Sequence, residues 1–102
     1  MLNEVSLVGI IEKIHEMKTT AKGNQETIIT LKIETDPSFE RPEDRYICVP
    51  VVLWSEPAYM AHSLCKEGSK LGIKGRISCE SGTQMNIICE KISFMDRYFK
   101  SE

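Results

Sequence analysis

The chain has 102 residues, 41% of them hydrophobic and 27% charged, and its formal net charge at pH 7 is −2. This length predicts a single domain over residues 1–102 with a core of its own. The small negative charge excludes a protein that holds polyanions by bulk charge, so any nucleic-acid site has to be a local patch.

The N-terminal segment, MLNEVSLVGIIEKI, lacks the basic start of a signal peptide. No stretch of the sequence approaches the roughly 20 apolar residues that a membrane helix needs. We therefore expect a cytoplasmic protein with no membrane partner.

The first predicted strand runs from Glu4 to about Met17, and both of its faces carry apolar side chains. Leu7 belongs to one alternating set, whereas Val8 and Ile10 belong to the other. Such a strand is usually covered on both sides, by the core and by a partner sheet or subunit, so we expect a homodimer or homotetramer formed through it. Gly9 predicts a bend or bulge of the kind that a small barrel needs to close.

A hairpin loop is predicted at Lys18–Gln25, with its turn at the Gly-Asn pair. Lys18 and Lys22 in this loop are candidate contacts to a bound strand of nucleic acid, although loop lysines need no function. The second strand follows at Glu26–Thr35. Its inward set is Ile29, Leu31 and Ile33, and its outward set is Ile28, Thr30, Lys32 and Glu34.

A long exposed loop is predicted at Asp36–Arg45, and Phe39 within it is a candidate exposed aromatic. The third strand runs over Tyr46–Trp54. Its alternate residues form an apolar face of Ile47, Val49, Val51 and Leu53 and a second face of Tyr46, Cys48, Pro50, Val52 and Trp54. The second face therefore carries an aromatic side chain at each end.

A short helix is predicted after the third strand. Ser55 is a suitable N-cap, and Glu56 and Pro57 suit a first helical turn. Lys66 and Gly68 supply the usual ending. The stripe expected on one face of the helix is Ala58, Ala61, Leu64 and Cys65.

After Gly68-Ser69 the alternation returns to a period of two, which predicts a fourth strand. One face is Leu71, Ile73, Gly75 and Ile77, and the other is Lys70, Gly72, Lys74 and Arg76. The second face is basic, although an ordinary solvated strand has the same pattern. A tight turn at Cys79–Gln84 leads to the last strand, roughly Met85–Met95.

The four cysteines are widely spaced and form no CxxC pair, which predicts neither a zinc site nor disulfide bonds. We expect reduced cysteines that serve as small apolar residues, with Cys48 as the exception because its parity puts it on the face of Tyr46 and Trp54. The chain has no recognisable paired carboxylates, glycine-rich phosphate loop or nucleophile, so we expect no cofactor and no enzyme activity.

The predicted order is three strands, one short helix and two strands. This order suits an all-β protein, a five-stranded Greek-key barrel of the OB-fold type with its helix between strands 3 and 4. The second and third strands of such barrels, with their flanking loops, typically bind oligonucleotides or oligosaccharides. A fold alone does not define a function.

Several segments, in order, resemble the bacterial single-stranded DNA-binding protein (SSB) family. They are MLNEVSLVGII, VVLW before the helix, KEGSKLGIKGRI and IICEKISFM. The stretches ICVPV, AHSL and GRISC are also similar to primosomal replication protein N, a short relative that is an OB-fold homodimer. The resemblance implies an OB-fold, an oligomer built partly through the first strand, and sequence-tolerant binding of single-stranded DNA.

The resemblance also implies site residues. Trp54 matches a position where the family carries an aromatic that stacks on bases, and Phe39 matches another. A third family aromatic falls near Cys48, which cannot stack, and Tyr46 on the same face could substitute for it. The fourth belongs to the loop between the last two strands, which has no aromatic here. The candidate phosphate contacts are Lys32, Lys74 and Arg76, together with Lys18 and Lys22.

The sequence stops at Lys100-Ser101-Glu102, so we expect the long tail with an acidic tip that the family carries to be absent. The resemblance thus implies a short form, bacterial or phage-derived and associated with the nucleoid, with weaker DNA binding and no recruitment through a tail. We expect a non-enzymatic protein that binds single-stranded DNA in replication, recombination or repair, with replication or recombination proteins as further partners.

Two alternatives stay open. One is an accessory replication protein that works mainly as a scaffold for replication restart, and the other is an OB-fold interaction module without nucleic-acid binding. Ordinary structural roles also compete with the site residues. Trp54 could simply cover the edge of the helix, and Tyr46 and Phe39 could fold back onto the core.

Overall fold

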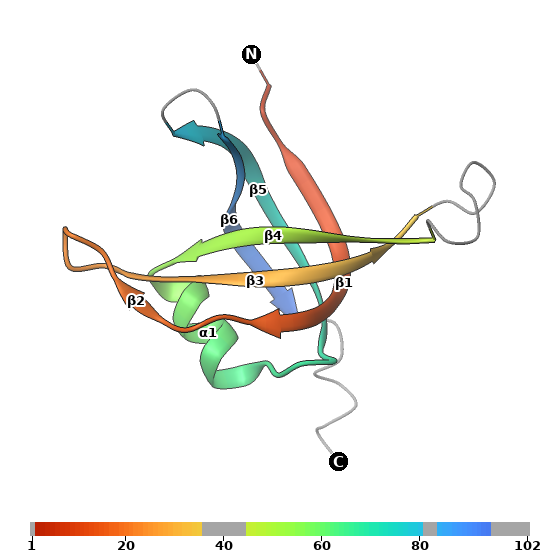
Figure 1. Ribbon diagram of the computed structural model, residues 1–102, viewed down its shortest axis with the longest axis horizontal. Helices are drawn as coiled ribbons and strands as arrows, with labels where there is room; N and C mark the ends of the chain where they lie inside the picture. The colour runs from red at the N-terminus through yellow and green to blue at the C-terminus, as the bar shows by residue number, and fades with distance from the viewer. Residues whose placement is uncertain (1, 36–44, 81–83, 95–102) are drawn as a thin grey trace.

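The computed structural model describes residues 2–35, 45–80 and 84–94, and Figure 1 shows its ribbon. The elements, in chain order, are β1 (Val5–Ile14), β2 (Lys18–Thr19), β3 (Gln25–Glu34), β4 (Tyr46–Trp54), α1 (Glu56–Leu64), β5 (Lys70–Glu80) and β6 (Gln84–Phe94). The boundaries agree closely with the sequence prediction, and β2 is a two-residue addition that pairs with the start of β3.

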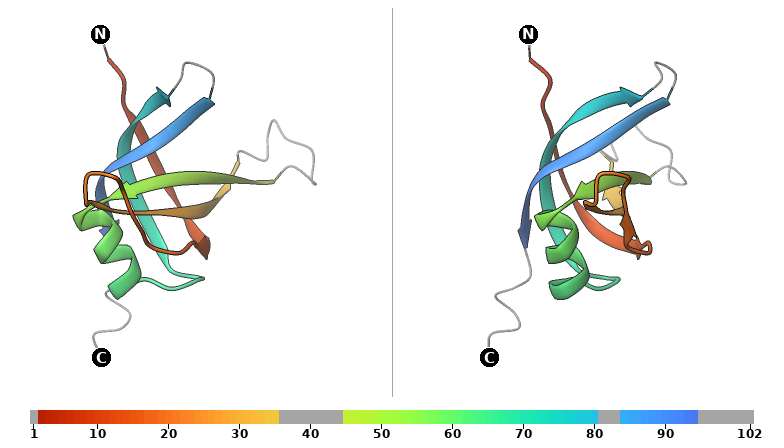
Figure 2. Two further views of the ribbon diagram at one scale, coloured as in Figure 1. Left: turned by 60° about the vertical axis from the view of Figure 1, so that its left-hand side comes forward. Right: turned by 90° about the vertical axis from the view of Figure 1, so that its left-hand side faces the viewer.

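Strand β1 closes the sheet into a barrel because its two ends pair with different neighbours. Residues 5–10 pair with β5, and residues 10–14 pair with β3. The closed order is β1-β5-β6-β4-β3, in which β4 and β6 run parallel and all other pairs are antiparallel. The two turned views in Figure 2 show the strands crossing around a common interior. The predicted five-stranded OB-fold barrel with one helix is confirmed.

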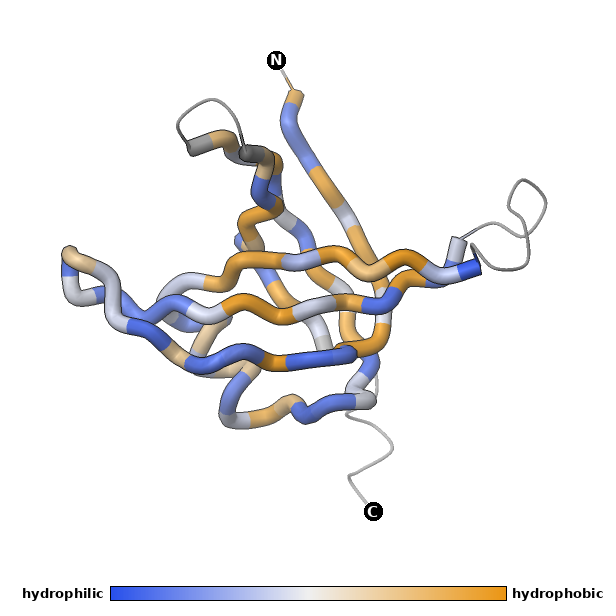
Figure 3. Tube along the Cα trace, viewed as in Figure 1, coloured by the Kyte–Doolittle hydropathy of each residue, from blue (hydrophilic) through white to orange (hydrophobic). Residues whose placement is uncertain are grey.

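The core fills the barrel, and α1 lies against one end of it (Figure 1). Its buried side chains come from β1, β3, β4, β5, β6 and α1: Ile11, Ile29, Leu31, Val51, Leu53, Leu71, Ile73, Cys89, Ala58 and Ala61. Figure 3 shows the corresponding alternation of apolar and polar residues along the paired strands. The inward sets predicted for β3, for β5 as far as Ile73 and for the second half of β4 therefore reach the core.

Three residues differ from the predicted apolar sets. Ile47 is 48% exposed because β3 and β4 extend beyond the barrel at this end (Figure 1), so no core lies beneath it. Ile77, towards the far end of β5, is also exposed. Leu64 is 58% exposed because α1 ends there, and only its first two turns place alanines against the core.

Val52 differs in the opposite sense, since it is buried although it lies on the outer face of β4. It has Ile28 of β3 beside it on one side and Ile88 of β6 on the other. Arg76 of β5 lies opposite Ile88, so one row of outward side chains crosses four strands. This row makes the outer face of β3, β4 and β6 continuous.

Gly9 and Gly75 allow strands to approach closely. A Cβ atom on Gly75 would clash with the carbonyl oxygen of Ile88, at the register shift between β5 and β6. A Cβ atom on Gly9 would lie 2.7 Å from the carbonyl oxygen of Lys32. The irregularity in β1 falls between Ile11 and Lys13 rather than at Gly9, so Gly9 serves the approach of β3 and not a bulge.

Ser55 precedes α1 as predicted, but its side chain makes no capping hydrogen bond. Its φ of 57° and ψ of −122° place it in a conformation that glycine prefers. Its N–H donates to the carbonyl oxygen of Gln25, which ties the start of the helix to β3. In the described part of the chain, no helix has the length and apolar character needed to cross a membrane.

Candidate nucleic-acid interface

The outer face of β3 and β4 carries the two described aromatics predicted for the site. Tyr46 and Trp54 lie at opposite ends of β4 and are 49% and 37% exposed. They are eight positions apart, which corresponds to about 27 Å along an extended strand. Phe39 lies outside the described residues. We call this surface, from Tyr46 to Trp54 with the facing side chains of β3, the outer β3–β4 face.

Lys32 sits beside Tyr46 on this face. Its register partner on β4 is Cys48, and its ammonium nitrogen lies 4.7 Å from the centre of the Tyr46 ring. This distance is within the range of a cation–π contact, which holds the positive charge over an aromatic surface. The arrangement places one cation next to a potential stacking platform.

A hollow of about 450 Å³ lies at the other end of the face, between Trp54 and the hairpin that joins β2 to β3. Thr20 and Asn24 close the hairpin, since the Thr20 N–H donates to the Asn24 carbonyl and the Asn24 N–H donates to the Thr20 hydroxyl. The residues that line the hollow are Thr20, Ala21, Lys22, Asn24, Glu26, Trp54 and Ser55. The hairpin therefore brings Lys22 and Trp54 to one cavity.

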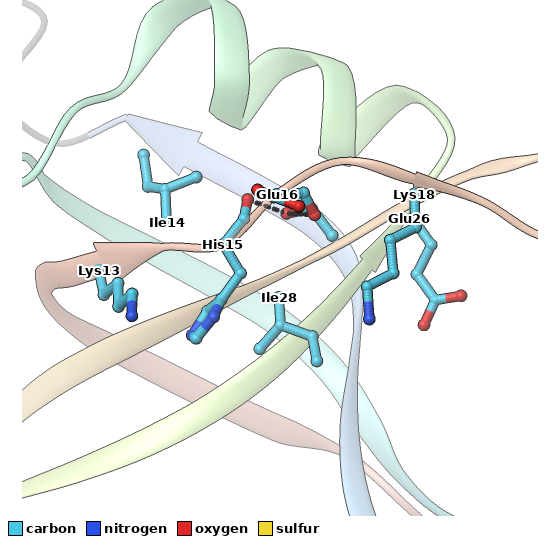
Figure 4. Close-up of a pocket in the computed structure, with 8 residues that line it drawn as sticks. Lys13, Ile14, His15, Glu16, Lys18, Glu26 and Ile28 are labelled. Carbon is cyan, nitrogen blue, oxygen red and sulfur yellow. Dashed lines mark hydrogen bonds between the residues drawn. The ribbon is translucent and has the colours of Figure 1, made fainter.

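A second hollow, of about 420 Å³, adjoins the first at Glu26. Its lining consists of Lys13, Ile14, His15, Glu16, Lys18, Glu26, Thr27 and Ile28. Figure 4 shows the side chains of His15, Lys18 and Glu26 projecting to one side of the strands, away from α1. Lys18 therefore lies at this end of the outer β3–β4 face with Lys22 and Trp54.

The base of this second hollow is held by a polar network. The Thr27 hydroxyl lies 2.8 Å from the carbonyl oxygen of His15 and 3.3 Å from that of Glu16, as the dashed lines in Figure 4 show. The Nε2 atom of His62, on α1, lies 3.0 Å from the same His15 oxygen. The network fixes the turn after β1 against the helix, so the hollow has a defined wall.

The two remaining predicted cations lie away from the lysines of the hairpin, and each pairs with a carboxylate. Arg76 donates to Glu90 at 2.8 Å, and Lys74 lies 2.7 Å from Glu4. Arg76 shares the outer row of Val52, whereas Lys74 lies further around the barrel, between β1 and β6. The bond to Glu4 raises the pKa of Lys74. The structure thus gathers Trp54, Lys18 and Lys22 at one end and Tyr46 and Lys32 at the other.

Cys48 lies near the Tyr46 end of the face, opposite Lys32, and is exposed, as its place in the strand alternation predicts. Its thiol donates to the Glu12 carboxylate at 3.0 Å, and this hydrogen bond is the main cause that raises the pKa of the thiol above its ordinary value. Cys79 is also exposed, contrary to the expected apolar role, whereas Cys89 is buried and burial raises its pKa to about 11.

Glu12 and Glu26 are site neighbours that sequence reasoning missed. Both are ordinary outward glutamates in the sequence pattern. Only the pairing of β3 with β1, β2 and β4 brings them beside Cys48 and Trp54. Among the described residues, no group of three His, Cys, Asp or Glu side chains could hold a metal ion.

The barrel topology is that of an OB-fold protein, in which the corresponding face commonly binds oligonucleotides or oligosaccharides. The model of the single-strand binding protein family matches residues 2–95, and the chain belongs to this family.

Named relatives agree with this assignment. The chain is 27% identical to the single-stranded DNA-binding protein of Enterococcus faecalis, covering all of this chain and 58% of that protein. It is also 27% identical to single-stranded DNA-binding protein B of Bacillus subtilis, over 94% of this chain and 92% of that one. The chain thus spans less than two thirds of the Enterococcus relative.

Solved structures show the same fold. The PriB protein of Ralstonia solanacearum superposes with a TM-score of 0.74 at 12% identity, covering 92% of this chain and 98% of that one. The single-stranded DNA-binding protein of Thermus aquaticus gives a TM-score of 0.72 at 21% identity, covering 92% of this chain and 50% of that one.

The hydrogen bond between the Cys48 thiol and the Glu12 carboxylate can be tested by the rate of thiol alkylation. The substitution Glu12→Gln removes the acceptor carboxylate, so the pKa of Cys48 should fall and more thiolate should be present at mildly alkaline pH. We expect faster alkylation of Cys48 by iodoacetamide, with a pH profile moved to lower pH, measured by peptide mass spectrometry. Cys79, exposed on β5, is the internal control whose rate should not change. An unchanged rate for Cys48 would contradict the hydrogen bond.

Proposed function

We propose that this protein binds single-stranded DNA along the outer β3–β4 face. In this proposal Trp54 and Tyr46 stack on bases, and Lys32, Lys18 and Lys22 contact phosphates. The observation that carries the proposal is the exposed indole of Trp54 at a hollow that also contains Lys22. Membership of the single-strand binding protein family supports it. Replication, recombination and repair are the processes in which such binding would act.

The face suits a flexible strand better than a duplex. Each base stacked on an aromatic contributes about 1–3 kcal/mol and tolerates any sequence, because every base has a π face. Tyr46 and Trp54 lie about 27 Å apart, and this distance leaves room for several nucleotides along β4. Small or flat side chains, Cys48 and Pro50, lie between the platforms and leave the track open.

The charges on the face predict modest affinity. Three lysines lie on or beside the face, while Glu12, Glu26 and Glu34 lie among them. For single strands, a plot of the logarithm of the binding constant against the logarithm of salt concentration has a slope of about −0.7 per phosphate contact. Three contacts therefore predict a slope of about −2. Lys74 is not among the proposed phosphate contacts, because it lies further around the barrel and pairs with Glu4. Arg76 is a peripheral contact that would have to exchange Glu90 for phosphate.

The sharpest test uses the single tryptophan. A thymidine oligomer of about 12 nucleotides, within the usual site size of an OB-fold, should quench the fluorescence of Trp54. The substitution Trp54→Ala should weaken binding roughly tenfold or more by gel shift or anisotropy, since one stacking contact is lost. Tyr59→Ala is the matched control, because Tyr59 is an exposed aromatic on α1 outside the face.

Three other results would separate the alternatives. Loss of affinity in Tyr59→Ala but not in Trp54→Ala would place the DNA elsewhere on the barrel. No quenching and no shift at low salt would contradict DNA binding and favour an interaction module. Tight binding of replication-restart proteins with negligible affinity for DNA would favour the scaffold.

We also propose that the protein forms a homo-oligomer through β1. Val8 and Ile10 on its outer face are 50% and 45% exposed. Gly72 lies opposite Val8 and leaves a shallow hollow of about 320 Å³ between β1, β5 and β6. Two exposed β-branched side chains beside an open hollow form an apolar strip that a second copy of the strand can cover.

A lysine at position 8 tests this proposal. We expect Val8→Lys to shift the sedimentation of the protein from an oligomer to a monomer, because the new charge would have to be buried in the interface. Ile77→Lys, at an exposed apolar position of β5, is the control that should leave the sedimentation unchanged. A wild-type protein that sediments only as a monomer would overturn the proposal.

A further inference from the structure

Glu26 occupies a special place at the end of the outer β3–β4 face. It pairs in register with Trp54 on β4 and with Lys18 on β2, and it is half-buried. It lines both hollows at this end of the face. Within residues 2–35, 45–80 and 84–94, its carboxylate has no hydrogen-bond or ion-pair partner. An acceptor with two oxygens thus lies beside the proposed stacking platform.

The hollow beside Trp54 has the properties of a pocket for one base. Its volume of about 450 Å³ lies within the usual range of about 300–1,000 Å³ for small-molecule sites. Its lining includes Trp54, whose indole is a stacking surface, Asn24, which carries an amide, and Lys22, which carries a positive charge. Tyr46, at the other end of β4, lines neither this hollow nor its neighbour. The two ends of the face therefore differ in what they can recognise.

We propose that this hollow binds an unpaired guanine, with Trp54 stacked on the base and the Glu26 carboxylate accepting from its Watson–Crick edge. The inference rests on the proposed function, because it assigns a base to one position of the same DNA track. Guanine presents two adjacent donors on that edge, the N1–H and the N2 amino group, which match the two oxygens of a carboxylate. Adenine and cytosine each present one amino group.

Thymine stacks on Trp54 like any base but matches the Glu26 carboxylate least well. Its single N3–H donor lies between two carbonyl oxygens, and both would face the negative carboxylate. A carboxylate without a donor also repels the phosphates of the bound strand, so Glu26 weakens binding of sequences that place thymine there. Binding is therefore tolerant of sequence along most of β4 and selective at the Trp54 end.

The test compares oligomers that differ in one base. Thymidine oligomers of about 12 nucleotides carry a single central guanosine, adenosine or inosine, and their affinities are measured by anisotropy at one salt concentration. Guanosine and adenosine both stack as purines, so their ratio isolates the hydrogen bonds. We expect the guanosine oligomer to bind roughly tenfold more tightly than the adenosine oligomer, as a bidentate contact provides. Inosine, which lacks the 2-amino group, should lose most of that advantage.

Two variants assign the preference to Glu26. Glu26→Ala should reduce the guanosine-to-adenosine ratio to near one while retaining binding, with the fold checked by circular dichroism. Glu34→Ala is the matched control, because this substitution removes the same charge. Glu34 lies opposite Tyr46, at the other end of the same strand. The control variant should keep the full ratio.

The outcomes distinguish this inference from the proposed function. Equal binding of the guanosine and adenosine oligomers by the wild-type protein, with Trp54 quenched by both, would overturn the guanine pocket and leave DNA binding intact. Loss of the ratio in Glu34→Ala as well would overturn it by showing an effect of bulk charge. No binding of any oligomer would overturn both proposals.

Discussion

Closure of the barrel through β1 is the constraint on which the rest of the structure depends. One strand pairs with β5 along its first half and with β3 along its second half, so it has to change neighbours within ten residues. The change needs close approach of backbones, and Gly9 permits it because any side chain there would meet the carbonyl oxygen of Lys32. Gly75 permits the corresponding approach of β5 to Ile88 on β6.

Closure also determines which surfaces are left for binding. With the inward side chains of β3 and β4 in the core, their outward side chains form a face that α1 does not cover (Figures 1 and 2). The hairpin between β2 and β3 then extends this face at the Trp54 end and supplies two lysines and two hollows. The site therefore arises from the alternation of inward and outward side chains along β3 and β4 and from one hairpin, rather than from a dedicated binding loop.

The sequence predicts much of this arrangement, because the alternation of side chains between the two faces of a strand can be read from neighbouring residues. Alternation alone places Tyr46 and Trp54 on one face and Leu31 and Leu53 in the core. The sequence prediction of burial fails where the arrangement of neighbouring strands determines whether a side chain is covered. Ile47 is exposed because β4 extends beyond the end of the barrel, and Val52 is buried by neighbours on two other strands.

The pairing between strands is the information that sequence reasoning lacks. Lys74 and Arg76 read as a free basic face, yet their partners Glu4 and Glu90 become visible only when β1 and β6 are placed beside β5. The position of Glu26 opposite Trp54 likewise follows from the register of β3 on β4, which no local pattern encodes. These long-range contacts divide the predicted site into two ends with different chemistry.

The central claim is that single-stranded DNA lies on the outer β3–β4 face, and mapping of backbone amide chemical shifts tests it most directly. On titration of the ¹⁵N-labelled protein with a thymidine oligomer, we predict the largest changes at Lys22, Lys32 and Trp54. Amides around Lys74 on β5 should move little. Changes concentrated on β5 and β1, with the hairpin and Trp54 unaffected, would contradict the account.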